Sequence, residues 1–390
     1  MSSICLHNGT VLTGFAAMED CAVLVSDGVI VDVFMDKRLS KKHIPPDARW
    51  IDVKGAYIAP GFIDTHIHGT GGFGTDQNDP QALLELSRVL PRYGVTSFIP
   101  TLYPAPREEL LSALRAFAAV LGREEGAHIA GFHLEGPFVS PSMLGVQRPE
   151  TLSPVDLNFM EALWDASGGH IVNMTVAPEL KGMRELALYC IKKGIVLQAG
   201  HSAAAYENMV EGMQVGILHS THLFNAMSKL DHRNPNAVGA ILIHPELSCE
   251  IIADGQHVHP DLVRLLRREK PLDKIVLVTD ALTPTGLEGG RLVANGQEVV
   301  LQDGVFQRAA DGVIAGSSLT MLQGVKNLVS WGFTVEEAVK TASSTPAQVM
   351  HFAKKGAIIP GNDADLVVFD ASFTLRATMV GGTLLQENNT

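Results

Sequence analysis

Histidine and carboxylate residues recur where apolar, strand-like segments of this 390-residue chain end. The first such segment ends in His66-x-His68, and because strand side chains alternate with a period of two, both imidazoles face the same way. Later segments end in, or lead to, further groups of this kind: Glu135, His201, His222, His257 and Asp280. Converging imidazoles and carboxylates are what a divalent cation such as zinc binds. The pattern therefore predicts a metal site, provided that the fold brings these strand ends together.

Three of these residues are the strongest ligand candidates. Glu135 follows an apolar run and precedes Gly-Pro, and His201 and His222 each follow an extended stretch. The alternative interpretation of each is an ordinary polar residue in a loop. With the paired histidines of the first segment, they form a predicted ligand set for one or two ions. His219, three residues before His222, faces the other way on a strand, so we expect it to pack or to support the ligands.

Two further residues are candidates for direct roles in a reaction. Asp280 follows the apolar run 275–278, and an aspartate beside a metal-activated water can take its proton and pass it to a leaving group. A helix N-cap is the alternative for Asp280. His257 could orient a substrate carbonyl or donate a hydrogen bond to it. A loop histidine satisfied by its own surroundings is the alternative for His257.

The middle of the chain alternates between strand-like and helix-like segments. Eight predicted strands cover 59–66, 96–102, 129–134, 171–177, 195–199, 219–223, 250–253 and 275–279. Helices are predicted over 80–93, 107–121, 157–164, 181–193, 204–215 and 319–331. This alternation favours an α/β fold, a (β/α)8 TIM barrel, whose strands open their carboxyl ends on one face. A doubly wound sheet is the rival architecture.

The two ends of the chain are rich in strands. Residues 21–34 predict two strands joined at Ser26-Asp27-Gly28, and 364–369 and 376–385 predict further strands. We expect a small β-sandwich domain from residues 1–57 and 359–390. The catalytic barrel would then occupy 58–358, with a β-hairpin inserted near 291–313, before the last barrel helix.

Composition limits the class of protein. Hydrophobic residues make up 46% of the chain and charged residues 18%, which predicts a sizeable core. The net charge of −12 argues against a nucleic-acid partner or an anionic membrane surface. The four cysteines show no C-x-x-C spacing, and no run of 18 apolar residues or secretory leader is evident. These observations predict a soluble, cytoplasmic protein.

Two motifs invite other functions. Residues 69–74 match G-x-G-x-x-G, but the preceding strand ends in two histidines and no helix start follows, so we favour a loop folded close over the metal. Residues 200–204 miss G-x-S-x-G at the last position, which argues against Ser202 as a nucleophile.

Several of these segments are familiar. Residues 60–68 (PGFIDTHIH) resemble the first-strand signature of the amidohydrolase superfamily, and 361–370 (GNDADLVVFD) resemble its closing strand. Within that superfamily the chain resembles the N-acetylglucosamine-6-phosphate deacetylase family in six more segments. These are, in order, residues 133–138, 200–204, 221–227, 252–258, 277–280 and 315–320.

The resemblance implies a barrel of the amidohydrolase type and assigns roles. Metal, zinc or iron, would lie on Glu135, His201 and His222, with His66 and His68 available for a second ion. The resemblance also implies that Asp280 is the catalytic acid and base and that His257 polarises the acetamide carbonyl. The implied phosphate contacts are Asn225, Ala226 and Arg233, the last reaching across from the neighbouring subunit of a homodimer.

The implied reaction is metal-dependent hydrolysis of the acetamide of N-acetylglucosamine 6-phosphate, giving glucosamine 6-phosphate and acetate in amino-sugar catabolism. The same resemblance leaves N-acetylgalactosamine 6-phosphate as an alternative substrate. One departure bears on substrate contacts: Gln147 stands where the family often has histidine, and it offers a neutral hydrogen bond in place of an imidazolium.

Two other functions fit the sequence less well. A cyclic amidase of the dihydroorotase or hydantoinase type would carry a carboxylated lysine on the fourth strand, and residues 171–177 contain no lysine. A non-catalytic assembly protein on the same fold would be expected to lack ligands that this chain retains.

Overall fold

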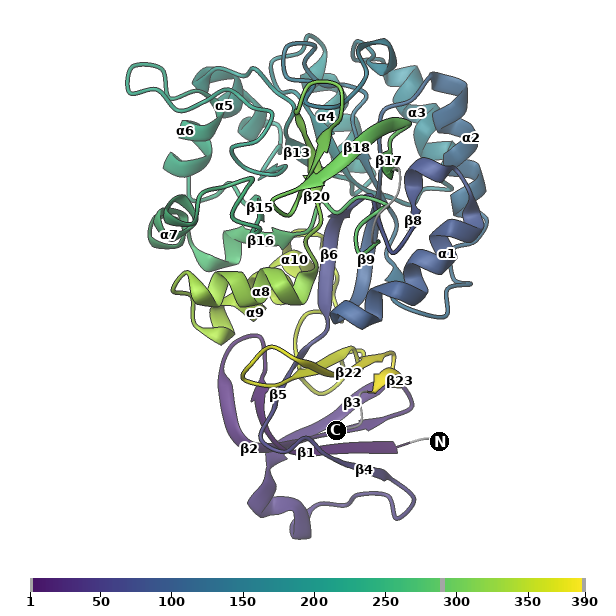
Figure 1. Cartoon of the computed structure of the whole chain (residues 1–390), viewed down its shortest axis with the longest axis vertical. Coiled ribbons are helices and arrows are strands. Elements are labelled where there is room, and N and C mark those ends of the chain that lie inside the picture. The colour runs from purple at the N-terminus through teal and green to yellow at the C-terminus, as the bar shows by residue number, and fades with distance from the viewer. Residues whose placement is uncertain (1–2, 288–291, 388–390) are drawn as a thin grey trace.

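The computed structural model describes residues 3–287 and 292–387. Parallel strands in sequence order form a curled sheet surrounded by helices (Figure 1). Hydrogen bonds join β6 to β9, then β11, β12, β13 and β14, while β15 and β16 pair separately. The strands are β6 (Phe62–Ile67), β9 (Val95–Leu102), β11 (Phe132–Glu135), β12 (Ile171–Val176), β13 (Val196–Ala199), β14 (His219–Ser220), β15 (Cys249–Ile252) and β16 (Ile275–Val278).

Backbone hydrogen bonds also link the two parts of this sheet. Ser220 N donates to Ser248 O at 2.9 Å, beside β14 and β15, and Asp280 N donates to His66 O at 2.9 Å, beside β16 and β6. The curled sheet therefore fits the predicted (β/α)8 barrel. Because the neighbours follow sequence order, a doubly wound sheet, which needs a reversal of strand order, does not describe it.

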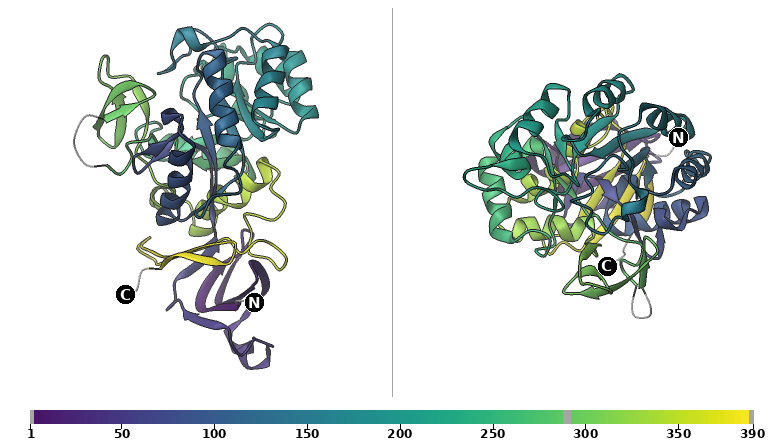
Figure 2. Two further views of the ribbon diagram at one scale, coloured as in Figure 1. Left: turned by 90° about the vertical axis from the view of Figure 1, so that its right-hand side faces the viewer. Right: turned by 90° about the horizontal axis from the view of Figure 1, so that it is seen from above.

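Helices cover the outside of the curled sheet, as the view from above makes plain (Figure 2). They are α1 (Pro80–Val89), α2 (Arg107–Ala118), α3 (Leu157–Ala166), α4 (Met183–Lys192), α5 (Tyr206–Gln214), α6 (Asn236–Ile243), α7 (Pro260–Glu269), α8 (Met321–Ser330), α9 (Val335–Ala342) and α10 (Ser344–Val349). Local chemistry sets some starts: the Asp79 and Asp156 side chains cap α1 and α3. Two helices, α9 and α10, follow the segment predicted as the last barrel helix.

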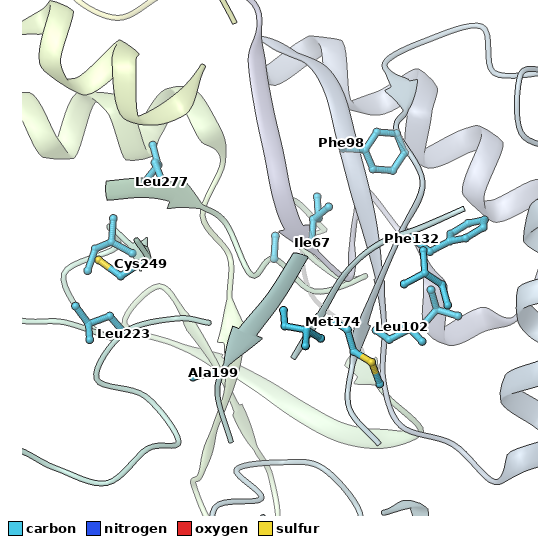
Figure 3. Close-up of a cluster of buried hydrophobic side chains, with 14 of the residues drawn as sticks. Ile67, Phe98, Leu102, Phe132, Met174, Ala199, Leu223, Cys249 and Leu277 are labelled. Carbon is cyan, nitrogen blue, oxygen red and sulfur yellow. The ribbon is translucent and has the colours of Figure 1, made fainter. Parts of the chain in front are cut away.

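The main core lies between the strands and these helices. Side chains such as Phe98, Phe132 and Leu277 belong to one cluster of buried apolar residues that runs around the sheet (Figure 3). Other strand residues are polar and equally buried: Thr101, His133, Thr175, Gln198 and Glu250. Because a buried polar group must find a partner, these residues bond to one another and form a polar layer inside the barrel.

A second sheet contains strands from both ends of the chain (Figure 1, bottom). Its order is β23-β22-β21-β5-β1-β2-β3, and β4 also pairs with β1. The strands are β1 (Ser3–Leu12), β2 (Ala17–Ser26), β3 (Val29–Met35), β4 (Arg49–Asp52), β5 (Tyr57–Pro60), β21 (Leu366–Phe369), β22 (Leu375–Val380) and β23 (Thr383–Glu387). We call it the terminal sheet. The expected domain boundary, after residue 57, falls within strand β5, which leads directly into β6.

Turn residues explain how the terminal sheet is folded. Asp27 and Gly28 have φ of 49° and 81°, as the tight turn between β2 and β3 requires, which confirms the predicted hairpin. The single strand predicted over 376–385 is wrong. Gly381 and Gly382, with φ of 52° and 78°, reverse the chain there and separate β22 from β23.

The expected insertion is larger than one hairpin. Four antiparallel strands form it: β17 (Leu292–Ala294), β18 (Gln297–Gln302), β19 (Val305–Arg308) and β20 (Ile314–Ser317). The prediction of a single hairpin is therefore wrong, and its first residue, Arg291, lies outside the described residues. Gln297 Nε2 donates to Val146 O at 2.9 Å, which ties the insertion to the loop after β11. Figure 2 (left) shows the insertion standing beside the barrel.

The remaining elements are short. Three strands of two residues each are β7 (Gly69–Thr70), β8 (Phe73–Gly74) and β10 (His128–Ile129). Turns of 3₁₀ helix cover Asp36–Lys41, Thr75–Gln77, Leu90–Tyr93, Pro149–Thr151 and Leu272–Lys274. Across residues 3–287 and 292–387, none of the helices has the length and apolarity needed to cross a bilayer.

Candidate active site

Glu135, His201 and His222 form one group of converging side chains. Their side-chain ligand atoms lie within 4.8 Å of one another. The Nε2 atoms of both histidines are 3.1 Å from the same oxygen, Glu135 Oε1, and 3.2 Å from each other. All three side chains are buried. The structure thus brings together three residues that stand far apart in sequence at the ends of β11, β13 and β14.

A second group contains His66, His68 and Asp280. The Nε2 atoms of both histidines lie 3.5 Å from Asp280 Oδ1. Glu135 connects the two groups, because its Oε1 is 3.5 Å from His66 Nε2 and its Oε2 is 3.5 Å from His68 Nε2. One carboxylate therefore faces all four histidines predicted as ligands.

The hydrogen bonds of His66 and His201 test whether these groups suit a cation. His66 Nδ1 donates to Glu250 Oε2 at 2.8 Å, and His201 Nδ1 donates to Met143 O at 2.8 Å. With the ring proton on Nδ1, a neutral imidazole presents a lone pair at Nε2. Both lone pairs then face carboxylate oxygens, an arrangement that is favourable only with a positive charge between them. The donor set therefore fits one or two divalent cations.

Unusual backbone angles aim three of these side chains. His201, His222 and Asp280 have φ of 45°, 22° and 49°, in the left-handed region. This region costs a residue with a Cβ about 1 to 2 kcal/mol, and such residues concentrate at functional sites. Each one stands where a strand gives way to a loop, so the left-handed turn directs its side chain over the barrel mouth.

Charge within the site shifts its titrating groups. Burial alone would raise the pKa of Glu135, but His201 and its neighbours hold it well below the usual range. Burial opposes the charged form of His66, yet Glu250, Asp280 and Glu135 raise the pKa of His66 to about 10. A cation that binds His66 must therefore displace a proton.

Glu250 is a site residue that the sequence analysis missed. Its Oε2 accepts from His66 Nδ1 and, at 3.0 Å, from the backbone N of His222, and its Oε1 accepts from Gln198 Nε2 at 3.1 Å. Burial opposes ionisation, but His66 and the other donors lower the pKa of Glu250 to about 2. The signal in the sequence was an acidic residue within an otherwise apolar strand, Cys249–Ile252.

The polar layer continues below Glu250. His133 lies between Thr101 Oγ1 at 3.0 Å and Thr175 Oγ1 at 2.9 Å, and burial lowers the pKa of His133 well below its ordinary value. His219 Nδ1 contacts Ser248 Oγ at 2.8 Å, and its Nε2 is 3.8 Å from Glu250 Oε1. Both histidines are thus placed beneath the ligand groups.

His257 and Gln147 each make one defining hydrogen bond. His257 Nδ1 donates to Asp254 Oδ2 at 2.6 Å, which leaves Nε2 for another partner. Burial acts to raise the pKa of Asp254, but the bond from His257 lowers it overall. Gln147 Nε2 donates to Glu135 O at 2.9 Å, while Gln147 Oε1 is buried without a partner in the described chain. Gln147 is thereby fixed next to a predicted ligand.

The expected phosphate contacts are placed differently from one another. Asn225 N donates to His222 O at 3.0 Å, and Ala226 O accepts from Ser202 N at 3.1 Å, so both lie in the turn after His222. Arg233 is exposed on the loop before α6, where its backbone N donates to Asp231 Oδ1 at 2.8 Å. Within residues 3–287 and 292–387, no hydrogen bond or ion pair joins Arg233 to the ligand groups.

The two motifs that suggested other functions have structural explanations. Residues 69–74 form the β7–β8 hairpin, not a strand–turn–helix, and a Cβ on Gly74 would lie 2.0 Å from Thr283 Oγ1. The glycines are needed for this close approach. Ser202 Oγ donates to Glu179 Oε2 at 2.7 Å, and no histidine activates it in the described contacts.

The chain is similar to known deacetylases over nearly its whole length. The N-acetylglucosamine-6-phosphate deacetylase of Lysinibacillus sphaericus is 32% identical over 394 residues, 99% of each chain. The N-acetylgalactosamine-6-phosphate deacetylase of Escherichia coli O157:H7 is 31% identical, over 96% of this chain and 97% of that protein.

Solved structures are similar over nearly the whole chain. N-acetylglucosamine-6-phosphate deacetylase from Pasteurella multocida gives a TM-score of 0.92 at 28% identity, covering 99% of this chain and 100% of that one. A variant of the Mycobacterium smegmatis enzyme, in complex with N-acetyl-D-glucosamine-6-phosphate, gives 0.91 at 28% identity, with the same coverage. The model of the amidohydrolase family matches residues 57–385, and the chain belongs to this family.

Proposed function

We propose that this protein hydrolyses the acetamide of N-acetylglucosamine 6-phosphate to glucosamine 6-phosphate and acetate, in amino-sugar catabolism. The observation that carries the proposal is the convergence of four imidazoles on Glu135, with Asp280 beside two of them. The relatives named above support the substrate class. Among them is an N-acetylgalactosamine-6-phosphate deacetylase, so that epimer is the second candidate substrate.

The ligand set accounts for the hydrolytic step. Glu135, His201 and His222 would hold one divalent ion, zinc or iron, and His66 and His68 would hold a second. Bound there, such a cation supplies Lewis-acid chemistry, lowering the pKa of water and polarising a carbonyl group. The mixture of imidazole and carboxylate donors fits zinc or iron better than magnesium or calcium, which prefer oxygen ligands.

Asp280 and His257 would carry the proton transfers and the oxyanion contact. Asp280 Oδ1, near both histidines of its group, would accept a proton from the attacking water and return it to the departing nitrogen. His257, with Nδ1 held by Asp254, would donate from Nε2 to the acetamide oxygen as charge develops there. Because an amine leaves poorly unless it is protonated, Asp280 must both take the proton from the water and deliver it to the nitrogen.

Phosphate recognition would come from the turn after His222 and from a second subunit. Asn225 and Ala226 would seat the phosphate through the turn, and Arg233, exposed on its loop, would reach the site of the partner in a homodimer. A guanidinium gives charge-assisted bonds to a phosphate dianion. Gln147, anchored on Glu135, would contact the sugar. Because a sugar phosphate does not cross a bilayer unaided, we place the reaction in the cytoplasm.

We also propose two domains: residues 1–57 with 359–390, and 58–358. The terminal sheet would be a β-sandwich. One apolar cluster supports this, because it contains residues from both ends of the chain, including Leu6, Val23 and Leu366. A cyclic amidase is less well supported, because β12 (Ile171–Val176) carries no lysine.

The experiment is acetate release from N-acetylglucosamine and N-acetylgalactosamine, each with and without a 6-phosphate, using zinc- and iron-loaded protein. We expect rapid release from N-acetylglucosamine 6-phosphate and much slower release from the unphosphorylated sugars. Faster turnover of the galacto phosphate would select the second candidate. Absence of acetate from all four substrates would refute the proposal, and hydrolysis of dihydroorotate or hydantoin would then favour a cyclic amidase.

A further inference from the structure

Glu250 contacts one residue from each of the two ligand groups. Its Oε2 accepts from His66 Nδ1 at 2.8 Å and from the His222 backbone N at 3.0 Å. The Glu250 side chain is fully buried inside the barrel on β15. A single carboxylate oxygen thus connects the His66–His68–Asp280 group to the Glu135–His201–His222 group.

The first contact sets the tautomer of His66. A carboxylate only accepts, so His66 must carry a proton on Nδ1, and Nε2 is the nitrogen that presents a lone pair toward Glu135 and Asp280 once a cation has displaced its proton. Hydrogen bonds of this kind behind a metal-binding histidine fix the ring and raise its basicity. His68, the other histidine of the same group, has no such partner on Nδ1 in the described chain.

The second contact stabilises a strained backbone. His222 has φ of 22°, well outside the ordinary regions, and its N–H would be costly to bury without an acceptor. The Glu250 carboxylate supplies that acceptor. It therefore helps to hold the turn that points His222 Nε2 at Glu135.

Glu250 is itself held by the polar layer. Gln198 Nε2 donates to Glu250 Oε1 at 3.1 Å, and Asn173 Nδ2 donates to Gln198 Oε1 at 3.1 Å, which fixes the orientation of the Gln198 amide. The carboxylate is therefore supported on both oxygens. It has little freedom to turn away from His66.

We propose that Glu250 is the positioning residue that couples the two ligand groups, fixing His66 through its ring and His222 through its backbone so that both groups bind metal together. The inference rests on the metal centre proposed above but does not depend on which sugar is the substrate.

The test is zinc affinity, measured by titrating metal-free protein with Zn²⁺ against a competing chelator, in the wild type, E250Q and E250D. In E250Q the new NH₂ group must face either His66 and His222 or the Gln198 amide, so at least one donor loses its acceptor, and in both orientations the charge that strengthens the bond to His66 is lost. In E250D the shorter side chain cannot reach His66 Nδ1 and His222 N together. We expect each variant to bind Zn²⁺ about 10- to 100-fold more weakly than the wild type.

Glu124 provides a matched control. Its Oε1 also accepts from a histidine Nδ1, that of His128 at 2.9 Å, and from a backbone N, that of Ile129 at 3.3 Å, but at the amino end of the barrel. E124Q should bind Zn²⁺ within about twofold of the wild type, because no ligand depends on it.

Two results would overturn the proposal. One is wild-type zinc affinity in E250Q or E250D, and the other is a lowered thermal midpoint of the metal-free protein with unchanged zinc affinity, which indicates a purely structural role. If E250Q does not fold, E250D decides by the same criteria. Acetate release by the same wild-type preparation separates failure of the coupling from failure of the proposed function. If the wild type is active and binds zinc, and E250D binds zinc equally well, only the coupling is refuted. If the wild type binds no Zn²⁺, both the metal centre and the coupling are refuted.

Discussion

The ring of Tyr103 lies flat against that of His68, with centroids 3.7 Å apart and planes 8° from parallel. His68 Nδ1 has no hydrogen-bond partner in the described chain, so this stacking supports the ring behind Nε2, which lies 3.5 Å from both Glu135 Oε2 and Asp280 Oδ1. The two histidines of the H-x-H pair are therefore held in different ways, His66 by a carboxylate and His68 by an aromatic face.

Replacing Tyr103 should loosen His68. We expect Y103L to retain fewer Zn²⁺ ions per chain than the wild type at the same free Zn²⁺, because the flat aromatic surface behind the ring is lost. Y103F keeps that surface and should retain the wild-type number. Metal analysis after dialysis against buffered Zn²⁺ checks this, and equal metal content in Y103L and Y103F would contradict it.

Loss of the Asp280 carboxylate should stop proton transfer. We expect D280N to lower kcat by about 10²- to 10⁴-fold, the usual contribution of a positioned acid–base group, with zinc still bound at the Glu135 group. D303N is a matched control, because Asp303 has almost the same backbone angle, φ 51° against 49°, on an exposed turn of the insertion. Unchanged turnover in D280N would exclude the acid–base role.

Arg233 should act on the phosphate. We expect R233A to raise KM for the 6-phosphate substrate at least tenfold, the loss of one charge-assisted contact, while slow hydrolysis of the unphosphorylated sugar is unaffected. Initial-rate kinetics with both substrates test this. Equal effects on the two sugars would show that Arg233 does not recognise phosphate.

Mixing two impaired variants, assayed at a substrate concentration well below the KM of R233A, tests whether Arg233 acts across a dimer. In a mixed dimer of R233A and D280N, one site has both Asp280 and the partner's arginine, and the other site has neither. We expect the mixture, unfolded and refolded together, to show more activity at this low substrate concentration than the two proteins refolded separately. Absence of recovery, with mixed dimers shown to form, would place Arg233 in its own subunit's site.

The terminal sheet should show a definite pH dependence. Burial acts against ionisation, but hydrogen bonds from Ser372, Thr374 and Arg376 lower the pKa of Asp370 to about 2. Because the pKa of Asp370 is lower in the folded than in the unfolded protein, its charge stabilises the fold at pH values above the unfolded-state pKa, near 4. This stabilisation is lost as the pH falls toward 2.

D370N should therefore melt below the wild type at pH 7, and the gap between their thermal midpoints should narrow as the pH falls from about 4 toward 2. Thermal unfolding followed by circular dichroism at several pH values measures it. A gap that stays constant with pH would mean that the Asp370 charge does not contribute.

Much of the architecture was predictable from local pattern. Apolar strands ending in histidine or carboxylate are unusual, so the strands that present Glu135, His201 and Asp280 could be located and their ends expected to meet. The two errors in the number of strands, over 376–385 and in the insertion near 291–313, both fell at turn signals that the sequence contains. Asn295-Gly296 and Asp303-Gly304 join strands of the insertion, and both pairs have positive φ.

Contacts between distant strands could not be predicted in this way. Glu250 was read only as part of an apolar strand, because nothing near it in sequence shows that it faces His66 across the barrel. The stacking of Tyr103 on His68 likewise depends on the relative height of two strands. The predicted strand 219–223 ends early, at Ser220, because the chain turns at His222 to aim its imidazole, a requirement of the site that overrides strand propensity.

The pairing of β5 with β21 has a consequence for biosynthesis. Val367 lies opposite Ala59, so the segment that precedes the first barrel strand waits for a partner translated some three hundred residues later. Until that partner leaves the ribosome, β5 has an open edge, and open edges invite mispairing. A chain cut short near its carboxyl terminus would keep every metal ligand yet expose this edge, and we expect it to be lost to aggregation before its catalytic centre could be used.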